Sequence, residues 1–213
     1  MPVFFQHHDA DFRLMVWSDE EPESFFLEDL SESLGGMLPA HPLKRKQFLA
    51  GRFLLTQLVP NFPLQQIRIA EGGRPFLEQG SPYFSISHTS KYIAAIVHDQ
   101  QAVGIDVEQV SDRVLRVGNK FLSMAEQQLI QVVLDNAINL TQTILYTLAW
   151  SVKEASFKAL HETGVDFMRD LPIENIEWMN GFWRVEMGGK GSELEIHAHN
   201  MGPVCLAIAV RKV

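Results

Sequence analysis

Two acidic residues at the end of an apolar, β-branched stretch constrain this chain more than any other feature. The stretch AVGIDVE, residues 102–108, places Asp106 and Glu108 two positions apart. Residues two apart in an extended strand point to the same face, so the two carboxylates lie side by side. Like charges this close repel unless a cation or a shared proton relieves them. The pattern indicates either a site for a hard divalent cation such as Mg²⁺ or a strand end that is merely solvated.

The composition is that of a globular protein with a sizeable core. Of 213 residues, 46% are hydrophobic and 21% are charged, which argues against a disordered chain. The net charge of −8 argues against a nucleic-acid partner. The single cysteine, Cys205, excludes an internal disulfide and a cysteine-rich zinc site. The N-terminus does not read as a signal peptide and no apolar run is long enough to span a membrane, so we expect a cytoplasmic protein.

The order of the expected elements is similar in the two halves of the chain. Long helices are predicted at 41–59 and 141–161 from apolar spacing and from their stop signals. Strands are predicted at 12–18, at 83–87, 92–98 and 102–108 as one antiparallel meander, and at 173–179, 182–187, 193–199 and 204–211. The expected fold class is α+β, a pseudo-dimer of subdomains 1–108 and 109–213, with a site in the cleft between them. A chain that contains both halves needs no second copy, so we expect a monomer.

A second acidic site candidate lies in the predicted helix 141–161. The segment WSVKEASFK, residues 150–158, places Glu154 and Lys158 four apart and hence on one helix face. An ordinary surface ion pair is one interpretation. The other is that Glu154 joins Asp106 and Glu108 as a third carboxylate ligand of a metal ion.

Two further segments could contact phosphate. In FSISHTS, residues 84–90, His88 follows a strand and is surrounded by hydroxyl residues. It is either a phosphate donor or a structural histidine. In Gly72-Gly73-Arg74-Pro75 the glycines allow close approach of the backbone to a ligand. Arg74 can pair with a phosphate through two hydrogen bonds, or the segment is a plain turn with an exposed arginine.

The order and spacing of these motifs resemble one known family. The motifs are Gly-Arg-Pro, Phe-Ser-Ile-Ser-His, Val-Gly-Ile-Asp-Val-Glu, Phe-Leu-Ser-x-x-Glu at 121–126 and Trp-Ser-x-Lys-Glu-Ala-x-x-Lys at 150–158. Together they resemble the 4′-phosphopantetheinyl transferases, specifically the long, Sfp-type branch. The resemblance covers about residues 40 to 160, and the flanking elements agree with it in length and type.

The resemblance implies a specific reaction. Such enzymes move the phosphopantetheine arm of coenzyme A to a serine of an apo carrier protein and release adenosine 3′,5′-bisphosphate. By similarity, Asp106, Glu108 and Glu154 hold Mg²⁺, or alternatively Mn²⁺, against the pyrophosphate of coenzyme A. Glu154 is the expected base for the serine hydroxyl, and Lys158 is expected to stabilise the pyrophosphate charge.

The resemblance also implies residues that bind coenzyme A. Ser87 and His88 match the family's phosphate-contacting pair. Arg74 matches the basic residue of the Gly-(Lys/Arg)-Pro motif beside the nucleotide, and Arg52 matches the arginine on the first long helix. The role of the cluster at 44–46, Lys-Arg-Lys, stays open because it does not align with the lysines of relatives.

The carrier protein requires a local attraction, because carriers are usually acidic and so is this chain. Arg113 and Arg116 share a face if the segment at 111–118 is helical. We expect them, with apolar neighbours, to receive a helix of the carrier, while a solvated arginine pair is the alternative. Glu126 is either catalytic or the capping-box partner of Ser123.

Two other function classes are compatible with the same residues. A Mg²⁺-dependent nucleotide phosphohydrolase also uses several acids with arginine and lysine, but it does not require the whole ordered set of motifs. A non-catalytic module that binds coenzyme A or a carrier domain is the second alternative. The presence of all the acids favours the transferase over this module. The sequence does not name the physiological carrier among those of fatty-acid, polyketide and peptide synthesis.

Overall fold

The computed structural model describes residues 3–8, 11–30, 34, 38–137 and 139–212, and divides the chain into two compact units. Unit 1 is Met1–Gln101 and unit 2 is Ala102–Val213. The expected division after Glu108 differs from this one by the strand that carries the acidic pair. Asp106, Glu108, Glu154 and Lys158 consequently all belong to unit 2.

Unit 1 contains a four-stranded antiparallel sheet in the order β1-β2-β6-β5. Its strands are β1 (Val3–His8), β2 (Phe12–Ser18), β5 (Tyr83–His88) and β6 (Tyr92–His98). The strands β2 and β6 are rich in β-branched and aromatic residues, which favour extended backbone. A short hairpin of β3 (Ile67–Ile69) and β4 (Pro75–Leu77) follows the one-turn helix η1 (Leu64–Gln66).

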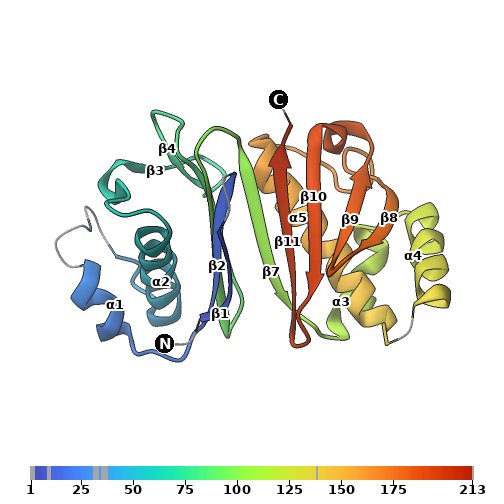
Figure 1. Ribbon diagram of the computed structural model, residues 1–213, viewed down its shortest axis with the longest axis horizontal. Coiled ribbons are helices and arrows are strands. Elements are labelled where there is room, and N and C mark those ends of the chain that lie inside the picture. The colour runs from blue at the N-terminus through green and yellow to red at the C-terminus, as the bar shows by residue number, and fades with distance from the viewer. Residues whose placement is uncertain (1–2, 9–10, 31–33, 35–37, 138, 213) are drawn as a thin grey trace. The chain divides into compact units, whose positions relative to one another are not determined.

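Two helices cover one face of this sheet: α1 (Glu23–Leu30) and α2 (Pro42–Leu58) (Figure 1). Pro42 opens α2, where a missing backbone N–H costs nothing. The core beneath the helices is aromatic, because Phe53 of α2 packs edge-on against Trp17 of β2 and near Phe26 of α1. Burial of these three side chains is essentially complete, so hydrophobic burial stabilises unit 1.

Unit 2 contains a five-stranded antiparallel sheet in the order β7-β11-β10-β9-β8 (Figure 1). Its strands are β7 (Val103–Gln109), β8 (Ile173–Met179), β9 (Phe182–Met187), β10 (Leu194–Asn200) and β11 (Val204–Arg211). The helices are α3 (Arg113–Val117), α4 (Met124–Asn136) and α5 (Gln142–Leu160), with one-turn helices η2 (Gly118–Lys120) and η3 (Gly189–Glu193).

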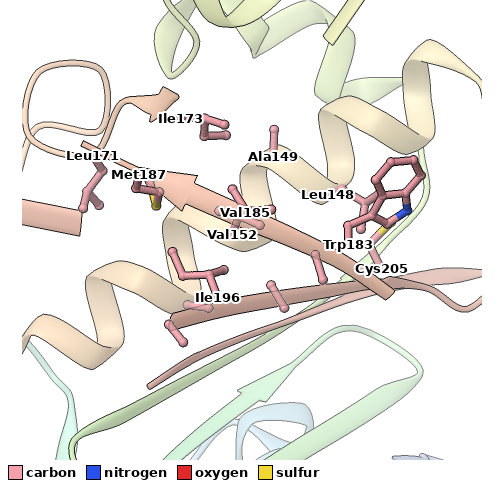
Figure 2. Packing of buried hydrophobic residues seen from close by; sticks show 14 of the residues in the cluster. Leu148, Ala149, Val152, Leu171, Ile173, Trp183, Val185, Met187, Ile196 and Cys205 are labelled. Atoms are coloured by element: carbon pink, nitrogen blue, oxygen red, sulfur yellow. The ribbon is translucent and has the colours of Figure 1, made fainter. Parts of the chain in front are cut away.

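The long helix α5 packs across this sheet and forms its core. Figure 2 shows Leu148, Ala149 and Val152 of α5 among Val185 and Ile196 of the strands. The helix also contacts β7 and β11. It therefore runs beside β7, the strand that carries the acidic pair. The side chains of α5 are consequently the ones that Asp106 and Glu108 can contact.

The α+β class is confirmed in both units, and the pseudo-dimer stays a prediction. The helices at 41–59 and 141–161 are found within one residue of their predicted starts and ends. The meander was wrong at its third strand: β7 pairs with β11 in the sheet of unit 2. The physical reason is that β6 already has β5 and β2 on its two edges. Strand β1 was not predicted.

None of the helices in the described residues is both long and apolar enough to cross a membrane.

Candidate active site on β7 and α5

A glycine brings the long helix directly onto the acidic strand. A Cβ atom on Gly104 would lie 1.9 Å from the carbonyl oxygen of Ala155 and 2.7 Å from the amide nitrogen of Ala159. Both are backbone atoms of α5, so no side chain fits at this position. Since Gly104 shares its strand face with Asp106 and Glu108, this close approach places the two carboxylates against the helix.

The first contact between the two predicted motifs is an ion pair. The Lys158 ammonium donates to Oδ1 of Asp106 at 2.8 Å and to the carbonyl oxygen of Ile105 at 3.0 Å. Asp106 is only 5% exposed, whereas the lysine side chain is 21% exposed. The pair is thus open to solvent from the lysine side and closed on the aspartate side.

The other two acids lie within electrostatic range of this pair. The pKa of Glu108 is raised to about 7, first by burial and then by the charges of Asp106 and Glu154, while the charge of Lys158 opposes the shift. Burial also raises the pKa of Glu154, with Asp106 adding to the effect and Lys158 opposing it. The structure therefore brings together the four predicted residues of strand and helix, with one lysine among three carboxylates.

The donor set suits a hard divalent cation in its chemistry. All the donors are carboxylate oxygens, the ligands that Mg²⁺ takes. Their mutual repulsion is only partly offset by Lys158, so a second positive charge would be stabilised here. In the described part of the chain no three His, Cys, Asp or Glu side chains stand in a ready-made metal geometry.

The other lysine in the central part of α5, Lys153, forms a buried ion pair outside the acidic site. Lys153 is fully buried, and its ammonium lies 2.5 Å from Oε1 of Glu126 and 2.8 Å from the carbonyl oxygen of Phe167. Glu126 also accepts hydrogen bonds from the backbone N–H of Ser123 at 2.7 Å and of Ile173 at 2.9 Å. Glu126 completes a capping box with Ser123 at the start of α4, so its predicted capping role is confirmed and its carboxylate is fully used in structure.

Unit 1 carries the residues that the resemblance assigns to the nucleotide. Helix α2 packs closely on β5, because a Cβ on Gly51 would lie 2.9 Å from Cγ2 of Ile86. One turn earlier, Nε2 of Gln47 donates to the carbonyl oxygen of Thr89 at 3.1 Å. These contacts place Arg52 on the same stretch of α2 that borders the end of β5.

Arg52 is a buried cation with unusual surroundings. The side chain is 9% exposed, and its guanidinium stacks on the ring of Phe48 at 3.5 Å from the centroid. Burial lowers the pKa of Arg52 to about 10. Within the residues that the structure describes, no carboxylate pairs with this guanidinium. A buried arginine of this kind is a favourable partner for an incoming anion.

The other predicted nucleotide contacts lie on elements that adjoin β5. Ser87 is buried and His88 is exposed at the end of the strand. Arg74 follows Gly73, whose φ of +81° favours glycine, and it precedes β4, which contacts β5. Burial lowers the pKa of Arg74. Arg52 thus lies on α2 and Arg74 in the turn before β4, and both of these elements contact β5, the strand that carries Ser87 and His88.

The two remaining basic clusters have separate outcomes. Arg45 pairs with Glu23 at 2.7 Å and Lys46 pairs with Asp19 at 2.9 Å, so two members of the cluster at 44–46 serve structure in unit 1. Arg113 and Arg116 are exposed on α3 of unit 2.

Comparison with known proteins decides the family. A family model described as the 4′-phosphopantetheinyl transferase superfamily matches residues 102–209, which is half of the chain and nearly all of unit 2. The chain belongs to the 4′-phosphopantetheinyl transferase superfamily. The matched region contains Asp106, Glu108, Glu154 and Lys158, so the superfamily assignment and the acidic site rest on the same part of the molecule.

Curated relatives agree with this assignment over shorter stretches. The chain is 30% identical over 118 residues to the 4′-phosphopantetheinyl transferase AcpT of Escherichia coli K12, covering 54% of this chain and 57% of that protein. It is 35% identical over 72 residues to the AcpT protein of Salmonella typhi, covering 33% of this chain and 36% of that protein. The chain thus spans between about a third and somewhat over half of these relatives.

Reasoning from sequence missed two features of the site and its surroundings. Gly104 was not singled out, although the small residues Ala155 and Ala159 on one helix face could have indicated a close contact. The Lys153–Glu126 pair joins residues far apart in the chain and carries no local signal.

Proposed function

We propose that the protein transfers the 4′-phosphopantetheine group of coenzyme A to a serine hydroxyl of an apo carrier protein and releases adenosine 3′,5′-bisphosphate. The observation that carries the proposal is the convergence of three carboxylates, Asp106, Glu108 and Glu154, around Lys158 within the region that matches the superfamily. In the reaction the serine oxygen bonds to the β-phosphorus, the bond from that phosphorus to the bridging oxygen breaks, and the bisphosphate departs.

Asp106, Glu108 and Glu154 would hold the divalent cation, Mg²⁺ or Mn²⁺. A bound cation neutralises the pyrophosphate oxygens and stabilises the leaving phosphate. The excess of carboxylate over ammonium in this place supports the assignment. The acids are held by β7 and α5, two regular elements in close contact, so their backbones are rigidly spaced.

Glu154 is the proposed base for the serine hydroxyl. Burial and the nearby Asp106 raise its pKa, which makes its carboxylate a better proton acceptor than an exposed glutamate. Lys158 lies one turn along the same helix face and donates two hydrogen bonds in the resting site. Its ammonium would stabilise charge on the pyrophosphate as the bond breaks.

The nucleotide end of coenzyme A is assigned to unit 1. Arg52 is a buried guanidinium beside an aromatic ring, and Arg74 follows a glycine turn. Both can pair with phosphate oxygens. Ser87 and His88 at the end of β5 would add hydrogen-bond donors to a phosphate.

The carrier protein is assigned to α3. Arg113 and Arg116 are exposed there, whereas Val114 and Leu115 pack against the core of unit 2. Charge reversal of both arginines to glutamate should raise KM for the carrier and leave KM for coenzyme A unchanged, because only the acidic partner is repelled. An unchanged KM for the carrier would remove α3 from the docking surface.

The test is carrier modification followed by mass spectrometry. The protein is incubated with coenzyme A, Mg²⁺ and an apo acyl or peptidyl carrier, and the carrier is weighed. A mass gain of one phosphopantetheine arm is expected, and Glu154→Gln should slow it by about 10²–10⁴-fold. Asp135→Asn, an exposed acid on α4, is the matched control and should leave the rate unchanged.

The outcomes separate the alternatives. Release of the bisphosphate without labelling of any carrier would favour a nucleotide phosphohydrolase. Binding of coenzyme A with no turnover on several carriers would favour a non-catalytic module.

A further inference from the structure

Helix α5 buries three hydroxyl side chains, and one of them differs from the others. Thr147, Ser151 and Ser156 are all fully buried. Thr147 donates to the carbonyl oxygen of Thr143 at 2.7 Å, and Ser156 donates to that of Val152 at 2.7 Å. Among the described residues, Oγ of Ser151 has no hydrogen-bond partner. A buried donor without a partner destabilises a fold, so this hydroxyl calls for a functional reason.

The direction of α5 relative to β7 fixes the level at which Ser151 lies. Near the start of the helix, Sγ of Cys205 contacts the carbonyl oxygen of Ile144, and Cys205 is paired with Glu108 across the sheet. Near its end, Ala155 and Ala159 meet Gly104. The helix therefore runs antiparallel to β7.

Asp106 lies midway between these two levels on the helix-facing side of β7. Ser151 precedes Ala155 by one helical turn, which places it on the same side of the helix and one step closer to Glu108. Strand residues two apart rise by about 6.6 Å and four helix residues by about 6 Å. Ser151, which lies one helical turn before the residue that contacts Gly104, is therefore at the level of Asp106, which lies two strand residues after Gly104.

We propose that Ser151 is a positioning residue of the acidic site, whose hydroxyl donates a hydrogen bond to the Asp106 carboxylate when that carboxylate turns to a divalent cation. The inference rests on the proposed metal site and deepens it. Ligating carboxylates are commonly oriented by hydrogen bonds from neighbouring groups. Ser151 stands three residues before Glu154 on the flank of α5 that also carries Lys158.

A serine hydroxyl and a lysine ammonium act differently on such a carboxylate. Lys158 already donates to Oδ1 of Asp106 at 2.8 Å, but its positive charge competes with a cation for the same oxygens. A hydroxyl orients the carboxylate without adding charge, so the attraction for the cation is preserved. Ser151 is therefore suited to hold Asp106 in place once Lys158 turns to the pyrophosphate.

The experiment compares two buried serines on one helix. Ser151→Ala removes the unpartnered hydroxyl, and Ser156→Ala removes one that is bonded to a carbonyl oxygen and lies 3.2 Å from Sδ of Met187. Each purified protein is titrated with Mn²⁺ alone, followed by electron paramagnetic resonance, and is unfolded in urea. Mn²⁺ is a suitable probe because carboxylates bind it as they bind Mg²⁺.

The two alanine variants are expected to differ from each other in both Mn²⁺ affinity and urea midpoint. Ser151→Ala should bind Mn²⁺ about 10-fold more weakly and unfold at the same or a higher urea midpoint. Ser156→Ala should bind Mn²⁺ as the unmodified protein does and unfold at a lower midpoint. Ser151→Cys keeps the volume and a weak donor, so its affinity should fall between those of serine and alanine.

Two outcomes would overturn the proposal, and they are distinguishable. Equal Mn²⁺ affinity in Ser151→Ala and the unmodified protein rejects the role of Ser151 alone. If the unmodified protein binds no better than Asp106→Asn, the metal site of the proposed function fails as well.

Discussion

Helix α5 carries two lysine–carboxylate pairs five residues apart, and they differ in how completely they are balanced. Lys153 and Glu126 are 0% and 2% exposed, and the hydrogen bonds of the capping box and of β8 add to the pair. Lys158 and Asp106 are more open and have two further acids beside them. The first pair is closed and matched in charge, while the second has an excess of negative charge. A lysine–carboxylate pair therefore serves structure at one position of α5, and under the proposed function the other pair serves ligand binding.

The largest effect is expected from Lys153→Met. Removal of the ammonium leaves Glu126 charged and buried, which costs about 3–5 kcal/mol of the free energy of unfolding. Urea denaturation measures this loss. Lys153→Met combined with Glu126→Gln should recover part of it, because no uncompensated charge remains. If the double variant recovers no stability, the Lys153 ammonium stabilises the fold through its hydrogen bond to the carbonyl oxygen of Phe167 and not through its ion pair with Glu126.

Lys158→Met should have the opposite profile. Loss of a charge that stabilises the pyrophosphate is expected to lower kcat for carrier modification by about 100-fold. The loss of stability should be smaller than for Lys153→Met, because the Lys158 side chain is 21% exposed and water screens it. Mass spectrometry of stopped assays measures the change in kcat, and urea denaturation of the same preparations measures the change in the free energy of unfolding. A stability loss as large as that of Lys153→Met would erase the distinction between the pairs.

The sequence was sufficient for the parts of the site that follow from local periodicity. The two-residue spacing of Asp106 and Glu108 and the four-residue spacing of Glu154 and Lys158 fix which side chains share a face, and the ion pair of Asp106 with Lys158 is present. The capping box at Ser123 was also readable, because its signal spans four residues.

The remainder depends on contacts between distant segments. The partner of β7 was mispredicted, since pairing depends on which strand edges are already occupied, and proximity along the chain favoured β6. The pairing of Lys153 with Glu126 joins α5 to α4 across a loop. No local pattern distinguishes that lysine from Lys158, although their surroundings differ.

Gly104→Ala tests whether the open pair depends on the close contact of strand and helix. The new Cβ would meet backbone atoms of Ala155 and Ala159 at 1.9 and 2.7 Å, so α5 must shift. The expected cost is about 1–3 kcal/mol in unfolding free energy, together with a lower transfer rate as Asp106 and Lys158 separate. Gly72→Ala is the control for the stability measurement alone, because in the described part of the chain, its two sequence neighbours aside, no heavy atom lies within 4 Å of a Cβ at that position.

The last expected effect is a pH dependence of stability that comes from the open site. The pKa of Glu108 in the folded protein is about 7, above its ordinary value of 4.5, because of burial, Asp106 and Glu154, with Lys158 opposing. The folded state therefore retains a proton that the unfolded state releases, and the free energy of unfolding should fall as pH rises from about 4.5 to about 7. Urea curves in metal-free buffer across this range measure the slope.

Glu108→Gln should flatten part of that slope, while Glu154, whose pKa is also raised, keeps the rest. Addition of Mg²⁺ should weaken the dependence in the unmodified protein, because a cation favours the ionised carboxylates. The closed pair offers the comparison: Lys153 has its pKa lowered by burial, and Glu126 opposes that shift, so Mg²⁺ should not change its contribution. A slope that is equal in Glu108→Gln and the unmodified protein would mean that the excess charge on β7 is relieved by solvent, and that the two pairs on α5 differ less than their surroundings indicate.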